Sequence, residues 1–96
     1  MQIRLENIKE NAASFMRSCG YAFLRAEAEE MSFARRLAGR DYPRFHVYTR
    51  AENGVLAVNL HLDQKKPSYE GANAHSGEYD GDLVEAEAER IRSFAN

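Results

Sequence analysis

The sequence lacks most of the features that identify a protein class directly. It has one cysteine, Cys19, which excludes an internal disulfide bond and fits a reducing compartment. No apolar run approaches the ~20 residues that a membrane-spanning helix requires. Glycine-rich phosphate loops, paired Cys-x-x-Cys motifs and the His-Glu-x-x-His motif of zinc proteases are also absent. Because the N-terminus is also too polar for a signal peptide, we expect a cytoplasmic protein without membrane contact.

Charge and length bear on the functional class, the number of domains and the oligomeric state of the protein. The net charge of −2 gives no global electrostatic case for a nucleic-acid-binding protein. The length of 96 residues suits one domain, and a hydrophobic content of 44% supports a small core, so we expect a single domain over residues 1–96. A domain near this size buries only ~60–70% of the surface of its unfolded chain, so a homodimer is a reasonable expectation from size alone.

The clearest local pattern is a β-hairpin centred on Asn53-Gly54. Two strand-like runs, 44–52 and 55–63, flank this dipeptide, which favours a type I′ turn because both central residues of that turn need positive φ. With a two-residue loop, His46 lies directly opposite His61.

Alternation along the two runs separates an apolar face from a polar face. The apolar face contains Phe45, Val47, Thr49, Ala51, Leu56, Val58, Leu60 and Leu62. The polar face contains four cross-strand pairs, which are Arg44 with Asp63, His46 with His61, Tyr48 with Asn59, and Arg50 with Ala57. A four-residue loop changes the pairs but not the faces, and only an odd-length loop or a bulge would mix them.

Two segments have helical periodicity. Apolar residues from Leu5 to Cys19 recur at helical spacing, and Gly20 follows in a position that suits the end of a helix. Near the C-terminus, Asp82 suits an N-cap with Glu85 three residues later, and an apolar stripe follows. The sequence therefore predicts one helix near each end of the chain.

The segment 21–40 allows two interpretations. Residues 26–30 are strong helix formers, whereas residues 31–38 alternate in a way that suits a strand. A strand over 32–37 would extend the hairpin to a three-stranded meander. Such a third strand is favoured because an isolated two-stranded hairpin is only marginally stable in water. We favour the strand, with a second helix as the alternative.

The segment 64–81 is a long loop with almost no aliphatic side chains. Loops of this length are uncommon in compact domains and are commonly functional or disordered. Its two tyrosines, its histidine and its several charges distinguish it from a flexible linker. We therefore expect it to fold back so that His75 or Glu78 approaches the polar face of the hairpin.

These elements predict an α+β fold. A small antiparallel hairpin or three-stranded meander carries the N- and C-terminal helices on its apolar face. The polar face then remains open to the long loop, a ligand or a second subunit.

The polar face is the candidate functional site. Opposed strand residues have Cβ atoms ~4.5–5.5 Å apart, so two opposed imidazoles can share one ion. Nitrogen and carboxylate ligands suit zinc or another divalent transition metal. The candidate metal ligands are His46, His61 and His75. The candidate residues for a small or anionic ligand are Arg44, Tyr48, Asn59, Asp63 and Glu78.

The leading interpretation is therefore a metal or small-ligand site, and an imidazole beside a carboxylate also suits acid–base catalysis. An ordinary surface ion pair would equally explain Arg44 and Asp63. One alternative is a nucleic-acid or protein binding module that uses the arginines and tyrosines of this face, of which nucleic acid is the less favoured partner. Another is a homodimeric structural protein without chemistry.

Overall fold

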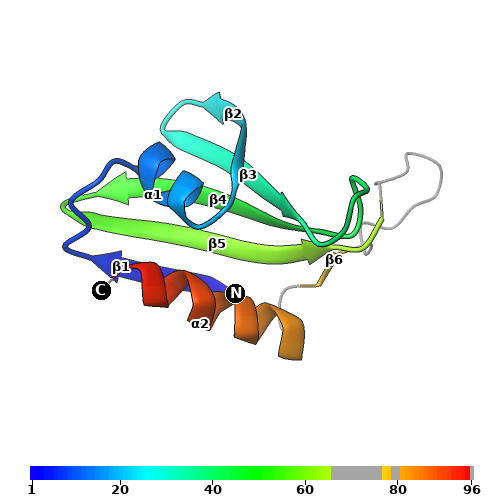
Figure 1. Ribbon diagram of the computed structural model, residues 1–96. Helices are drawn as coiled ribbons and strands as arrows, with labels where there is room; N and C mark the ends of the chain where they lie inside the picture. Colours follow the sequence, from blue (N-terminus) through cyan, green and yellow to red (C-terminus); the bar gives the residue numbers. More distant parts are fainter. Residues whose placement is uncertain (66–76, 79–80, 96) are drawn as a thin grey trace.

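The computed structural model describes residues 1–65, 77–78 and 81–95, and it has the α+β architecture expected from the sequence (Figure 1). In chain order, the described elements are β1 (Gln2–Glu6), α1 (Ala12–Ser18), β2 (Ala22–Glu27), β3 (Glu30–Arg36), β4 (Arg44–Glu52), β5 (Val55–Asp63), β6 (Gly77–Glu78) and α2 (Asp82–Phe94). The strands form one antiparallel sheet in the order β1-β5-β4-β3-β2, and the short β6 pairs with β5. Within the described part of the chain, neither helix is long and apolar enough to cross a membrane.

The sheet is larger than the predicted hairpin or three-stranded meander, because β1 and β2 add strands at its two edges. β1 replaces the first part of the predicted N-terminal helix. It pairs with β5 and turns Ile3 and Leu5 into the core, and the positive φ of 61° at Asn7 follows its end. The helix α1 begins only after Asn11, whose side chain caps the first turn. The helical prediction is wrong here because Leu5 fits both periodicities, and the edge of β5 stabilises the strand.

The β4–β5 hairpin has the register expected from its loop. Asn53 and Gly54 have φ values of 51° and 79°, as a type I′ turn requires. His46 lies opposite His61, and the pairing continues along both strands without a bulge. The apolar and polar faces are therefore separated as the alternation predicts.

The segment 21–40 contains two strands, so the second helix is wrong. β2 and β3 form a hairpin whose turn includes Ala28 at a φ of 53°. β3 pairs with β4 along its whole length, and it contains most of the strand expected over 32–37. The helix formers at 26–30 lie at the end of β2, in the turn and at the start of β3, because intrinsic propensity is a weak preference that sheet pairing overrides.

The core lies between the sheet and the two helices. Figure 1 shows α2 running alongside β1 and β5. The buried apolar cluster combines one face of the sheet with both helices, and its members include Ile3, Phe33, Phe45, Val47, Val58, Leu60, Phe15, Met16, Val84, Ala88 and Ile91. Both helices cover the apolar face, and the polar residues of β4 and β5 lie on the opposite face of the sheet.

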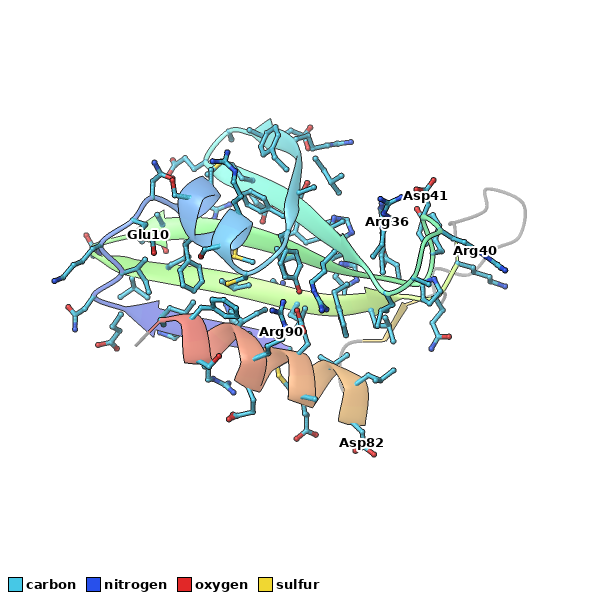
Figure 2. The ribbon with its side chains drawn as sticks, in the orientation of Figure 1. Glu10, Arg36, Arg40, Asp41, Asp82 and Arg90 are labelled. Atoms are coloured by element: carbon cyan, nitrogen blue, oxygen red, sulfur yellow. The ribbon has the colours of Figure 1, made fainter. Side chains whose placement is uncertain are left out.

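A buried carboxylate fixes α2 in place. Glu87 accepts hydrogen bonds from Tyr21 Oη at 2.6 Å and from Arg90 Nε and Nη2, each at 2.9 Å. Arg35 Nη1 lies 3.4 Å from the same carboxylate, and Arg90 also donates to the carbonyl of Cys19. Figure 2 shows Arg90 directed from α2 toward the sheet. This network joins α2 to β3 and to the connection between α1 and β2.

Candidate metal centre

His46 and His61 form a stacked pair on the polar face of the sheet. Their ring centroids lie 4.8 Å apart with an interplanar angle of 24°. Tyr48, two residues along β4, lies 4.6 Å from the His46 ring and 5.7 Å from the His61 ring. Strand alternation brings the three rings to one side of the sheet, since all three belong to the polar face.

Asp63 completes a triad with the two histidines. His46 Nδ1 lies 3.1 Å from Asp63 Oδ2, and His61 Nδ1 lies 3.2 Å from Asp63 Oδ1. Each carboxylate oxygen therefore meets a different imidazole. The side chains of all three residues are only 12% exposed, so this is not an ordinary solvated surface contact.

The Asp63 carboxyl is held in its charged form. Burial alone raises its pKa, but the hydrogen bonds from His46 and His61 outweigh that effect, and its pKa lies well below the usual range. Arg44 Nε lies 3.4 Å from Oδ2, so a guanidinium also contacts the carboxylate. The triad therefore combines two imidazoles with an ionised carboxylate in a mostly dry setting.

One nitrogen of the cluster is not satisfied by its neighbours. His46 Nε2 is buried and has no hydrogen-bond partner among residues 1–65, 77–78 and 81–95. Buried polar atoms nearly always have a partner, so an unpartnered ring nitrogen marks this cluster as a candidate functional site.

A pocket of about 280 Å³ lies beside the triad on the same face. Its floor is β4, which contributes Arg44, His46 and Tyr48, and its walls come from β2 and β3. The sequence analysis did not predict the pocket residues that β2 contributes, because it did not predict β2 as a strand. The alternation of Arg25 with Glu27 is the only indication of it in the sequence.

The structure brings together most of the predicted site residues. Arg44, His46, Tyr48, His61 and Asp63 are neighbours on the polar face.

The remaining predicted residues are not placed in the cluster. Asn59 lies on the same face opposite Tyr48, but it is exposed and contacts none of the triad in the interactions described above. The backbone of Glu78 pairs with Leu62, whereas its side chain and the whole of His75 lie outside the described residues. The predicted return of the loop to the polar face therefore remains a prediction.

Several arginines among the described residues lie close to a carboxylate. Arg35 belongs to the opposite face, where it contacts Glu87. Arg50 lies directly opposite the acidic Glu30, and Arg44 contacts Asp63. Arg36 lies opposite Arg44 and is 3.7 Å from Asp41, so Arg36, Arg44 and Arg50 each have an acidic neighbour.

Cys19 is suited to a structural role. It is buried in the core, and burial raises the pKa of its thiol to about 11, which opposes formation of the reactive thiolate.

Comparisons with the models of known protein families, with curated proteins and with solved structures each found no match. The chemistry of the triad therefore has to be inferred from its own geometry.

Proposed function

We propose that the protein binds one divalent transition-metal ion, such as zinc, through His46, His61 and Asp63. These are the residues that form a group able to hold a metal ion within the described part of the chain. Two imidazole nitrogens and one carboxylate are a donor set that zinc and other first-row metals accept.

The distances within the triad carry this proposal. In a tetrahedral zinc site with bonds of about 2.0–2.1 Å, neighbouring ligand atoms lie about 3.3 Å apart. The two separations between Nδ1 and a carboxylate oxygen, 3.1 Å and 3.2 Å, are close to that edge length. One ligand atom from each of the three residues lies within 4.8 Å of the others, so an ion can take the place of the hydrogens that the imidazoles share with Asp63 once the side chains close around it.

The burial of the triad supports the proposal. The backbone of β4 and β5 fixes all three Cα positions, so little conformational entropy remains to be lost when the ion binds.

Metal analysis of protein purified without a histidine tag tests the proposal directly. We expect bound metal near one equivalent, or a Kd for added zinc of about 10 µM or tighter in the metal-free protein. His46→Ala and His61→Ala should each abolish binding, and Asp63→Asn should weaken it strongly, because the amide lacks the carboxylate charge. Asn59→Ala is the matched control, since it changes an exposed residue on the same strand and face.

Thermal unfolding supplies a second readout. A ligand that binds only the folded state stabilises it by about 2.7 kcal/mol at 100 times its Kd. Zinc should therefore raise the Tm of the wild type and of Asn59→Ala by about 10 °C or more. The Tm of each triad variant should be the same with and without zinc. A wild type without bound metal and without a zinc response would contradict the proposal, as would triad variants that bind zinc like the wild type.

A further inference from the structure

The strand β2 is an edge of the sheet, and in the part of the chain that the structure describes no strand pairs with its outer side. Figure 1 shows this edge on the opposite side of the sheet from β1 and α2. All six residues of β2 are exposed, including Leu24 at 41%. Proteins usually protect such an edge with lysine, proline or a bulge, because its unpaired backbone groups can pair with another chain. β2 has neither lysine nor proline, and its register shift lies between Phe23 and Arg25, so the stretch from Arg25 to Glu27 remains a regular strand.

The turn between β2 and β3 determines which backbone groups point out of the sheet at this edge. A two-residue turn follows Glu27, so Glu27 and Glu30 form the hydrogen-bonded pair that closes the hairpin. Hydrogen-bonded and non-hydrogen-bonded pairs alternate along antiparallel strands, so Ala26 and Met31, the next pair, are not hydrogen-bonded to each other. The N–H and C=O of Ala26 therefore point away from β3, toward the free edge.

These outward groups of Ala26 can pair with the same groups in a second copy of the chain. When two identical strands run antiparallel with Ala26 opposite Ala26, each N–H donates to the C=O of the other copy around a two-fold axis. That axis sets the register of the whole contact. It places Arg25 opposite Glu27 of the second copy, and Glu27 opposite Arg25 of the second copy.

The charges of this edge are complementary to themselves in that register. Within one copy, Arg25 Nη2 lies 2.9 Å from Glu27 Oε1, and the two side chains are 70% and 73% exposed. An ion pair this exposed is weak, so both side chains can also contact the second copy. Opposite charges on directly opposed residues stabilise a pair of strands. The two copies together join two guanidinium groups and two carboxylates, and each carboxylate then lies beside a guanidinium of its own copy and one of the other.

We propose that the protein forms a two-fold symmetric dimer in which the outer edges of the two β2 strands pair antiparallel and join the two sheets into one. The regular part of the contact is short, because it consists of residues 25–27 of each strand. A standard interface buries ~1,600 Å², and this contact is smaller, so we expect a weak dimer with a Kd of about 0.1–1 mM. The dimer does not depend on a bound metal, since none of these contacts requires one.

Sedimentation equilibrium in EDTA, from about 20 µM to about 2 mM protein, tests the dimer. We expect reversible dimerisation of the wild type, together with amide resonances of β2 that shift with concentration in two-dimensional NMR spectra. Ala26→Pro should abolish dimerisation, because it removes the outward N–H on which the contact is centred. The variant should remain folded by circular dichroism, because that N–H does not pair with β3 and proline is accepted at the edges of sheets.

Charge reversal tests the register. Arg25→Glu and Glu27→Arg should each weaken dimerisation about tenfold or more, because each places like charges opposite each other twice in the dimer. The double variant with both changes should regain the Kd of the wild type, since opposite charges then face each other again. Arg4→Glu and Glu6→Arg are the matched controls. They make the same changes in net charge at exposed positions of β1, and they should leave the Kd unchanged.

Any of four results would overturn the inference. The first is a wild type that stays monomeric up to about 2 mM. The second is a folded Ala26→Pro variant that dimerises like the wild type. The third is a pair of single reversals in β2 that weaken the dimer no more than their controls in β1. The fourth is a double variant that dimerises as poorly as the single reversals. Because EDTA is present throughout, failure here leaves the metal proposal standing, and failure of the metal proposal leaves this one standing.

Discussion

Replacing Glu87 with glutamine should destabilise the fold far more than a comparable change elsewhere on α2. The Glu87 side chain is only 3% exposed and accepts hydrogen bonds from Tyr21 and Arg90, with Arg35 nearby. Glutamine preserves the volume but removes the charge, and its amide group would place two donors against the donors of Arg90. The buried ion pair is then broken from one side, which is the costly way to break it.

The expected loss of unfolding free energy in Glu87→Gln depends on how exposed the partners of Glu87 are. Breaking a buried pair by removing one member costs about 3–5 kcal/mol. Arg35 and Arg90 are 34% and 32% exposed, so both can regain part of their hydration, and we expect about 3 kcal/mol. That is a large share of the roughly 5–14 kcal/mol available to a domain of this size. The corresponding fall in Tm is about 12–24 °C.

Glu89→Gln on the same helix is the matched control. Glu89 is 75% exposed and pairs with Arg92 at 2.9 Å three residues later, so its loss should cost less than about 0.5 kcal/mol. Urea unfolding followed by far-ultraviolet circular dichroism measures both variants, which suits a chain without tryptophan. A Glu87→Gln variant within about 0.5 kcal/mol of Glu89→Gln would refute the idea that this network fixes α2.

Three further predictions concern the turn, the thiol and the metal site. Gly54→Ala should cost about 1 kcal/mol in urea unfolding because φ is +79° there, whereas Gly39→Ala, also in open space but without a positive φ, should cost much less. Stability should fall as pH rises from 9 toward 11, by up to about 1.4 kcal/mol per pH unit, because burial raises the pKa of the Cys19 thiol from 9.0 to about 11 and only the unfolded chain ionises in that window. Cys19→Ala should flatten this slope in pH-dependent urea melts, and an unchanged slope would contradict the assignment. Arg44→Gln should tighten zinc binding about tenfold in competition titrations, because it removes a cation 3.4 Å from Asp63, and weaker zinc binding would count against direct ligation by that carboxylate.

The hairpin was predictable because one local signal determined it. Asn53 and Gly54 accept positive φ, and the two flanking runs alternate cleanly, so register and faces followed from the chain alone. β1 and β2 were not predictable in the same way. Their residues gain stability from edge pairing with β5 and β3, which are distant or ambiguous in the sequence, and the helix formers before Glu30 indicated the wrong state.

The candidate site was also predictable only in part. Strand parity placed His46, His61 and Asp63 on one face, but the pair of Arg44 and Asp63 also fitted an ordinary surface ion pair. What separates the two interpretations is burial, because one carboxylate receives both imidazoles in a triad that is only 12% exposed. Parity fixes which residues meet, whereas burial depends on how the whole sheet curves and on what covers it. The pocket wall illustrates this dependence, since part of it comes from β2, an edge strand that we did not predict from the sequence.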